Sequence, residues 1–154
     1  MVVLKGVPRI LSPELLSVLA RMGHGDEIVL ADANFPSDSV CKSGPELIRA
    51  SGHKIPPLLE AILALLPLDS YVAAPVALMD LVPNDKERGL KTPVWDEYKL
   101  IVNRAEGHEV QVEQVERFMF YERAKKAFAV VTTGEGALYG NIILKKGVIP
   151  EPKS

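Results

Sequence analysis

The stretch Glu27-Ile28-Val29-Leu30-Ala31 decides the fold class, because its residues after Glu27 are apolar on both faces of an extended chain. Such a strand is buried on both sides, as in a sheet that helices cover. A helix is predicted before it, since Ser12 is a natural N-cap, Pro13 suits the first helical position, and apolar residues recur at helical spacing up to Met22. The chain therefore starts as a helix followed by a buried strand.

Helices and strands alternate along the rest of the chain. Apolar residues at helical spacing predict the helices, and short apolar or alternating runs predict the strands. The expected segments are helices over 57–67, 92–102 and 116–126, and strands over 110–115, 128–131 and 141–144. No repeat or linker divides them, so we expect a single layered α/β domain over residues 1–154, with helices packed on a sheet.

Composition argues against several classes of partner. The 154 residues are 47% hydrophobic, enough for a sizeable core, and the net charge of −2 offers no basic field for nucleic acid or an anionic membrane. The apolar run over 55–68 is broken by prolines and too short to span a bilayer, and the N-terminus lacks the layout of a signal peptide. A single cysteine, Cys41, allows no internal disulfide. We therefore expect a cytoplasmic protein.

His24 is the first candidate for chemistry, because it lies between Gly23 and Gly25 where the expected helix meets the expected strand. Imidazole has an ordinary pKa of about 6.5, which suits proton transfer near neutral pH, and glycines let a ligand approach the backbone. The alternative is an ordinary histidine on a surface loop. His53 and His108 have no recognisable companions, and neither HxH nor HExxH occurs, so no metal site is predicted.

Two aspartates follow apolar segments. Asp32 ends the buried strand, where ligands of open α/β sheets bind, and Asp69 follows the helix expected over 57–67. Each carboxylate either contacts a ligand or forms an ordinary turn by accepting from nearby backbone N–H groups.

Tyr139 and Asn141 are two residues apart on an expected strand, so their side chains are predicted to share a face. A phenol beside a carboxamide can donate to and accept from hydroxyl groups, the pattern that a sugar requires. The alternative is a core tyrosine whose hydroxyl is satisfied by the asparagine.

The helix expected over 116–126 combines charge with aromatic rings. Helical spacing places Arg117, Phe120 and Tyr121 on one face, where an arginine can bind an oxygen-rich ligand while rings cover its apolar edge. The alternative is an aromatic core stripe beside a solvated charge, and Phe118 and Phe128 are expected in the core.

The sequence contains no GxGxxG, GxxxxGK[ST] or GxSxG motif, so neither a phosphate-binding loop nor a nucleophile elbow is predicted. The residues alone leave open a cofactor-free acid–base enzyme and a binding module.

Four segments in order resemble the fucose mutarotase / ribose pyranase family. They are 22–28 (MGHGDEI), 31–32 (AD), 117–130 (RFMFYERAKKAFAV) and 139–148 (YGNIILKKGV), and the resemblance runs from about residue 5 to residue 150. The ribose branch is similar at His24, Asp32, Tyr139 and Asn141, but it typically has histidine where this chain has Arg117, and it lacks the FYERAKKA run. The chain therefore resembles the fucose branch.

The resemblance implies a compact three-layer α/β domain that assembles into a ring-like homo-oligomer. It also implies exchange of the α and β anomers of L-fucose, in support of L-fucose utilisation, without metal or cofactor. In this reaction an acid protonates the ring oxygen while a base removes the anomeric hydroxyl proton, the C1–C2 bond rotates, and the ring closes again.

By carry-over from the family, His24 is the proton donor and Tyr139 is its opposing catalytic partner. The implied sugar contacts are Asp32, Arg117 and Asn141, with Asp69 and Phe120 as further contacts, and Asp26 or Asp32 is expected to orient His24. Eight residues separate His24 from Asp32, about 26 Å if extended at roughly 3.3 Å per residue, so a site shared between subunits is expected.

Two rival functions remain at this point. One is a D-ribose pyranase, which performs the same class of chemistry on another ring. The other is a non-catalytic monosaccharide-binding domain, which would keep Asp32 and Asn141 but would not need His24 and Tyr139 together.

Overall fold

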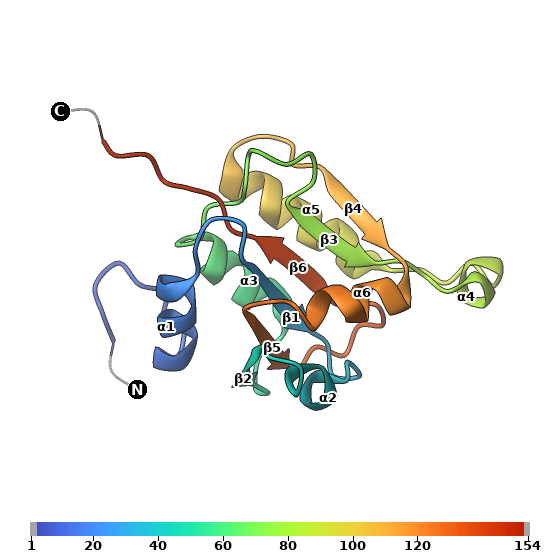
Figure 1. Cartoon of the computed structure of the whole chain (residues 1–154). Helices are drawn as coiled ribbons and strands as arrows, with labels where there is room; N and C mark the ends of the chain where they lie inside the picture. Colours follow the sequence, from blue (N-terminus) through green and yellow to red (C-terminus); the bar gives the residue numbers. More distant parts are fainter. Residues whose placement is uncertain (1–2, 153–154) are drawn as a thin grey trace.

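The computed structural model describes residues 3–152, which form one six-stranded sheet between layers of helices (Figure 1). The elements in chain order are α1 Pro13–Arg21, β1 Glu27–Ala31, α2 Ser37–Cys41, β2 Glu46–Ala50, α3 Ile55–Leu63, β3 Val76–Met79, α4 Pro83–Glu87, α5 Pro93–Glu106, β4 Val112–Val115, α6 Arg117–Ala124, β5 Ala129–Thr133 and β6 Ile142–Lys145. The predicted mixed α/β class, with helices packed on a central sheet, is confirmed.

The sheet is mixed, and one strand runs against the other five. Its order is β2-β5-β1-β6-β3-β4. β1 pairs in parallel with β5, which pairs in parallel with β2, while β3 and β4 are also parallel to each other. β6 lies antiparallel between β1 and β3. Strands β1 to β5 therefore share one direction, and their carboxyl ends lie at the same edge as the start of β6.

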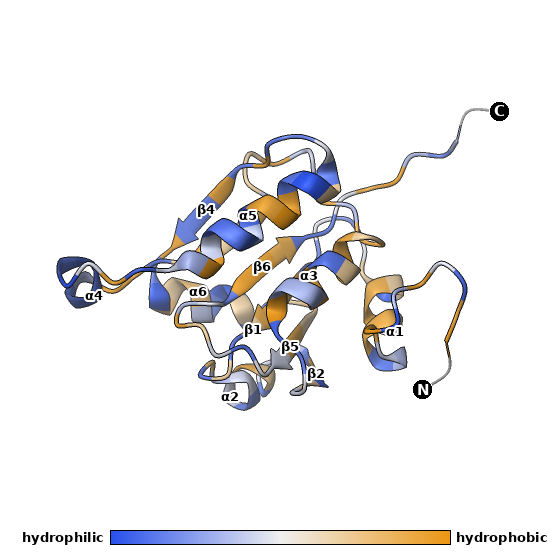
Figure 2. Ribbon diagram, turned by 180° about the vertical axis from the view of Figure 1, so that it is seen from behind, coloured by the Kyte–Doolittle hydropathy of each residue, from blue (hydrophilic) through white to orange (hydrophobic). Residues whose placement is uncertain are grey.

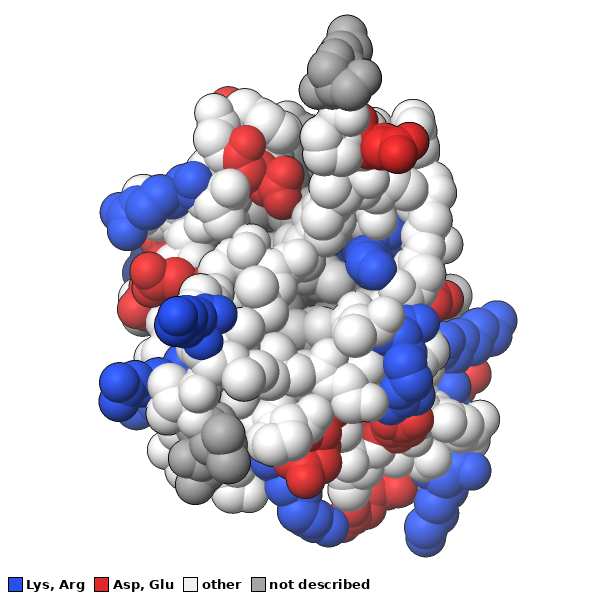
Figure 3. All heavy atoms as spheres, turned by 90° about the vertical axis from the view of Figure 1, so that its left-hand side faces the viewer, with Lys and Arg blue, Asp and Glu red and all other residues white. Residues whose placement is uncertain are grey.

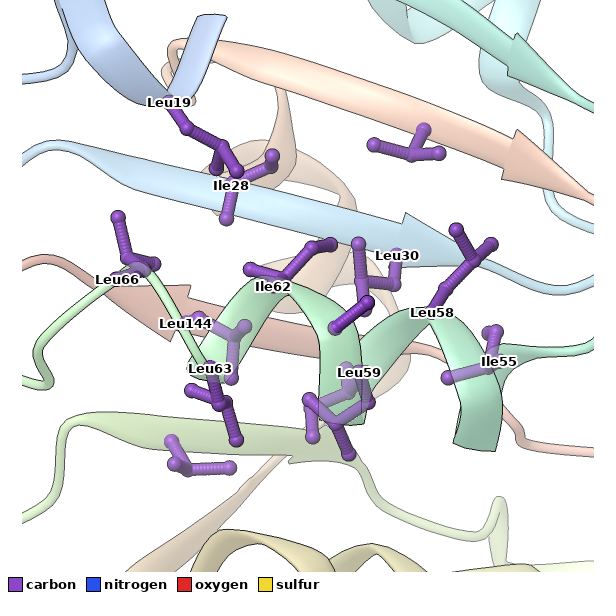
Figure 4. Packing of buried hydrophobic residues seen from close by; sticks show 14 of the residues in the cluster. Leu19, Ile28, Leu30, Ile55, Leu58, Leu59, Ile62, Leu63, Leu66 and Leu144 are labelled. Atoms are coloured by element: carbon purple, nitrogen blue, oxygen red, sulfur yellow. The ribbon is translucent and has the colours of Figure 1, made fainter. Parts of the chain in front are cut away.

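Alternate residues of the strands pack into two cores, one on each face of the sheet. Along β1, Ile28 and Leu30 face α1, α3 and α5, whereas Val29 and Ala31 face α2 and α6. Figure 2 shows α3 and α5 lying across one face, and Figure 4 shows leucines and isoleucines of α3 meeting residues of β1 and β6. This is the expected three-layer arrangement, and it explains why β1 is apolar on both faces.

Local signals set several helix ends, and the cap and first-turn proline predicted for α1 are confirmed. The Ser12 side chain accepts the backbone N–H of Leu15 at 3.1 Å and caps α1, with Pro13 in the first turn. Pro93 likewise begins α5, and Gly107 ends it in a left-handed conformation with φ 79°. None of the helices between residues 3 and 152 has the length and apolar character needed to cross a membrane.

Some elements have no local signal, and one expected core residue is exposed. The strands β2 and β3 and the short helices α2 and α4 are not among the elements predicted from the sequence, and of these only β3, Val76–Met79, is a short apolar run that could have indicated a strand. Phe118, expected in the core, is 63% exposed, because α6 turns that side of the helix toward solvent. Phe128 is partly buried against the core on the α1 side.

Candidate functional site

A small hollow lies at the edge of the sheet where the five co-directional strands end. Residues that follow such strands gather at the edge where ligands of open α/β sheets bind. The hollow encloses about 180 Å³. It is lined by Asp32, Asn34, Phe35, Met79, Arg117, Tyr121, Leu138, Tyr139 and Asn141. Four of the site residues expected from the sequence, Asp32, Arg117, Tyr139 and Asn141, therefore share it.

Asp32 and Asn141 meet across β1 and β6. The backbone N–H of Asp32 donates to Asn141 Oδ1 at 2.7 Å, so the NH₂ group is what the asparagine can still offer a ligand. The Asp32 carboxylate accepts the backbone N–H groups of Asn34 at 3.0 Å and Gly140 at 3.1 Å. Burial raises the pKa of Asp32, although these two hydrogen bonds oppose the shift. A buried carboxylate and an amide donor thus lie side by side.

Tyr139 reaches the hollow from a loop and not from a strand. Its backbone is left-handed, with φ 58°, a conformation that a non-glycine residue keeps only when neighbouring contacts hold it. Trp95 Nε1 donates to the carbonyl oxygen of Tyr139 at 2.8 Å, and the Tyr98 hydroxyl donates to that of Gly140 at 2.7 Å. The prediction that Tyr139 stands on a strand is wrong, because β6 begins after this loop, which side chains of α5 hold in place.

The hydroxyl of Tyr139 is hydrogen-bonded on two sides. It donates to Asp85 Oδ2 at 2.5 Å and accepts the backbone N–H of Val82 at 3.3 Å. Burial raises the pKa of Tyr139, and the hydrogen bond to the Asp85 carboxylate raises it further. Sequence reasoning missed Asp85, because it stands in a charged segment over 84–88 that looks like a solvated turn.

On α6, the side chain that faces the hollow is Tyr121 and not Phe120. Arg117 Nε donates to the Tyr121 hydroxyl at 3.0 Å, and both residues line the hollow. Phe120 has no exposed surface and packs edge-on against Phe35, with ring centroids 6.0 Å apart. The expected contact between Phe120 and a sugar is therefore corrected, since a residue buried in the core presents no surface to a ligand.

His24 lies at the opposite edge of the sheet, in the loop that leads into β1. Its Nε2 is 3.0 Å from Asp69 Oδ1, and its ring lies 5.1 Å from that of Tyr71. The carboxylate that orients His24 is therefore Asp69, because Asp26 instead accepts the backbone N–H of Gly23 at 2.7 Å. The expectation that Asp26 or Asp32 orients His24 is wrong.

The length of β1 separates His24 from the hollow. His24 precedes Glu27–Ala31 and Asp32 follows it, so the two side chains lie at opposite ends of a fully extended strand. Asp69 lies with His24 and not with Asp32, since a bridge between Leu68 and Lys146 places this part of the chain beside the far end of β6. A monosaccharide in the hollow cannot reach His24 of the same chain.

A larger groove elsewhere holds none of the candidate residues. It encloses about 900 Å³ between α3 and α5, and four of its charged side chains, Lys54, Glu60, Glu97 and Arg104, are exposed surface groups. The fifth, Glu135, is buried, and its carboxylate accepts the backbone N–H groups of Ile55 and Ala137. Within residues 3–152, no three His, Cys, Asp or Glu side chains cluster in a way that could hold a metal ion. The hollow beside Asp32 is thus the site where convergent polar groups meet.

Known proteins resemble this chain over nearly its whole length. Fucose mutarotase of Homo sapiens is 68% identical over 149 residues, which cover 97% of this chain and 96% of that protein. The structure of the fucose mutarotase from Streptococcus pneumoniae, in complex with L-fucose, matches with a TM-score of 0.84 and 48% identity over 96% of this chain and 100% of that one. FucU from Bifidobacterium longum matches with a TM-score of 0.89 and 45% identity over 94% and 99%.

The family model covers nearly the whole chain, including both edges of the sheet. It matches residues 5–149, a range that contains His24 and Asp69 at one edge and Asp32, Tyr139 and Asn141 at the other. With that match, and with relatives of such high identity along their full length, the chain belongs to the RbsD / FucU transport protein family.

Proposed function

We propose that this protein is an isomerase that exchanges the α and β anomers of L-fucose by opening and reclosing the sugar ring. The observation that carries the proposal is the hollow itself, in which a carboxylate, an amide, a phenol and a guanidinium converge at the carboxyl edge of the sheet. These groups match the donors and acceptors of a polyhydroxylated ring. Relatives named fucose mutarotase, one of them solved with L-fucose, support the same substrate.

In this proposal the polar groups of the hollow hold the sugar while two others move protons. Asp32 and Asn141 bind hydroxyl groups through oxygen acceptors and an amide donor, and Arg117 adds a charged donor from α6. An acid protonates the ring oxygen as a base takes the proton of the anomeric hydroxyl, which yields an open-chain aldehyde. After rotation about C1–C2, the same two groups exchange roles and close the ring on the other face.

We infer that the acid is His24 of a second copy of the chain. Within one chain, His24 and the Asp32–Tyr139 hollow lie at opposite edges of the sheet, so a neighbouring copy must supply the imidazole. Head-to-tail contact of one edge with the other, repeated around an axis, closes into a ring. The active site would then be built between subunits of a homo-oligomer.

The two edges have apolar surfaces that such a contact would cover. Phe118, Met119 and Leu138 are more than half exposed beside the hollow, and Tyr71 is 74% exposed beside His24. Figure 3 shows a broad uncharged area, ringed by charged side chains, on the side of the molecule that carries α1. Exposed apolar side chains that gather on one surface, such as Phe118 and Leu138 beside the hollow, typically mark protein interfaces.

Anomer exchange can be measured directly by saturation-transfer NMR between the two anomeric proton signals of L-fucose. We expect the protein to speed exchange of L-fucose more than that of D-ribose. The measurement on D-ribose tests the alternative that the protein is a ribose pyranase. A protein that binds L-fucose without speeding exchange would be a monosaccharide-binding domain, and the proposed activity would be lost. The cytoplasmic location and the single-domain organisation expected from the sequence stay predictions.

The shared site can be tested by mixing two inactive variants. His24→Ala and Tyr139→Phe chains would be unfolded together, refolded as mixed oligomers and assayed. If each site takes His24 from one copy and Tyr139 from the next, about a quarter of the sites in a random mixture carry both intact groups. Recovered exchange supports the shared site, and a mixture as inactive as its parents contradicts it.

A further inference from the structure

A protruding segment of the chain contacts the hydroxyl of Tyr139, which lines the hollow. Helix α4 lies at the tip of an arm, over 80–92, that projects away from the body of the molecule (Figure 1). Most of the arm is exposed, but the Asp85 side chain is only 19% exposed, because it turns inward and accepts the hydroxyl proton of Tyr139 at 2.5 Å. This contact links the arm to a residue of the proposed active site.

The surroundings of Asp85 keep it ionised. The hydrogen bonds from Tyr139 and from Arg88 lower the pKa of Asp85 and outweigh burial, which raises it. Lys86, the other cation of the arm that forms an ion pair, contacts Asp80 at 2.8 Å and not Asp85. Asp85 therefore faces Tyr139 as a carboxylate with one cation, Arg88, behind it.

This arrangement decides what Tyr139 can do to a sugar. Its own proton points at Asp85, so the phenol is poorly placed to donate to a ligand in the hollow. Its oxygen keeps a lone pair beside the long contact with the Val82 N–H, and that lone pair can accept from a sugar hydroxyl. Alone, a phenol is a weak base at neutral pH, because its ordinary pKa of about 10 means that it keeps its own proton. If a neighbouring group takes the phenolic proton, the oxygen can accept a proton from the sugar.

We infer that Asp85 is a positioning residue that makes Tyr139 the base of ring opening by receiving its proton. In this step, which rests on the proposed function, the anomeric O–H bond breaks and its proton passes to Tyr139 Oη. The Oη proton passes to Asp85 Oδ2, and the ring C–O bond breaks as its oxygen takes the proton of His24. The products are the open-chain aldehyde, neutral Asp85 and neutral His24. Reclosure runs every transfer backwards and restores the enzyme.

Other charges near Tyr139 cannot take this role. Arg117 on α6 is the cation that acts on the phenol, and it favours the phenolate without accepting a proton. Asp32 lines the same hollow, but its two carboxylate oxygens accept backbone N–H groups of Asn34 and Gly140. Asp85 is the carboxylate to which the Tyr139 hydroxyl donates.

The test is a double-mutant cycle of Asp85→Asn and Tyr139→Phe, with Lys86→Ala as the matched control on the same arm. Asp85→Asn should lower kcat for L-fucose exchange by about 10-fold or more, with a smaller change in KM, since the loss affects proton transfer. In the Tyr139→Phe background the same substitution should have almost no further effect, because coupled residues are not additive. Lys86→Ala breaks the other ion pair of the arm and should keep near-normal kcat.

A titration without sugar separates this inference from the proposed function. The alkaline absorbance change of Tyr139 is obtained as the difference between each protein and its Tyr139→Phe counterpart. Asp85→Asn should lower the pKa of Tyr139, because the carboxylate that favours the neutral phenol is gone. An unchanged titration, equal losses in both backgrounds, or an equal loss in Lys86→Ala would overturn the role of Asp85. If the unaltered protein shows no exchange of L-fucose, the proposed function fails and with it the relay, whatever the titration shows.

Discussion

His24 Nε2 lies 3.0 Å from Asp69 Oδ1, and this same oxygen also accepts the backbone N–H of Tyr71 at 3.1 Å. Asp69 Oδ1 thus orients the imidazole, and the backbone N–H of Tyr71 fixes its position. The arrangement resembles the carboxylate that orients a catalytic histidine in hydrolytic triads, where the anion also stabilises the protonated imidazole. Asp69 is therefore the partner of His24, and its expected contact with the sugar stays a prediction.

Asp69→Asn separates orientation from charge. An asparagine keeps Oδ1, and with it both acceptor contacts, but loses the charge that stabilises a protonated His24. We expect the variant to stay folded and its rate of L-fucose exchange to fall by about 10-fold or more, because His24 is then less able to act as the acid. Exchange rates by NMR and circular dichroism check this. Full activity would mean that the charge of Asp69 has no part in the reaction.

The pH dependence of stability should also report on Asp69. Burial opposes ionisation of this carboxyl, but the hydrogen bonds from Tyr71 and His24 outweigh burial, so the pKa of Asp69 lies below its ordinary value of 3.8. A lowered pKa contributes stability that is complete above the unfolded value and is lost as the pH falls through the folded value. The difference in unfolding free energy between the unaltered protein and Asp69→Asn should therefore shrink as the pH falls below about 5. Urea unfolding measured at several pH values below 5 checks this, and a difference that grows over that range would contradict the assignment.

His24→Ala and Tyr139→Phe should each lower anomer exchange by about 100-fold or more, the usual worth of a placed acid or base. Both side chains are at least partly exposed, so both variants should keep the circular dichroism of the folded protein. Saturation transfer on L-fucose measures the loss. A folded variant with near-full exchange would remove that residue from the chemistry.

The buried Phe120 and the exposed face of Tyr121 should behave differently when truncated. Phe120→Ala leaves a cavity against Phe35 and should lower the free energy of unfolding by about 3–5 kcal/mol. Tyr121→Ala removes a wall of the hollow and a partner of Arg117, so it should instead raise KM and weaken the preference for L-fucose over D-ribose. Urea unfolding and exchange rates on both sugars distinguish the two. A change of selectivity without loss of stability in Phe120→Ala would restore Phe120 as a sugar contact.

Tyr98→Phe tests the support of the Tyr139 loop. The buried Tyr98 hydroxyl donates to the carbonyl oxygen of Gly140 at 2.7 Å, and its loss leaves that acceptor unpaired. We expect a loss of about 1–3 kcal/mol in the free energy of unfolding and a higher KM for L-fucose. Thermal unfolding and exchange kinetics measure these effects. A variant with unchanged stability and KM would show that Trp95 alone suffices to hold the loop.

Much of the fold was predictable because its signals are local. The N-cap at Ser12, the proline that begins α5 and the apolar run of β1 each act within a few residues of their own position. The strand β2 was not predictable, since its burial alternates weakly at the edge of the sheet. Phe118 misled for a related reason: an aromatic residue within a helix does not reveal which side of that helix meets the core.

The candidate residues were also visible in the sequence, but their grouping was not. His24, Asp32, Tyr139 and Asn141 stand out by residue type and neighbours. The sequence placed Tyr139 and Asn141 on one strand, whereas the structure holds Tyr139 in a left-handed loop. It offered two carboxylates for His24, and the structure supplies a third, Asp69.

The sequence by itself determined the residue types, the helix ends and the buried strand, because these depend on contacts between near neighbours. Only the tertiary structure decided which groups meet, since those contacts join distant positions. Asp32 and Asn141 are 109 residues apart, His24 and Asp69 are 45 apart, and Tyr139 and Asp85 are 54 apart. Strand order and direction bring each pair together, and they depend on the packing of the whole chain. The same topology sets His24 and Tyr139 at opposite edges of the sheet, which no spacing along the chain could reveal.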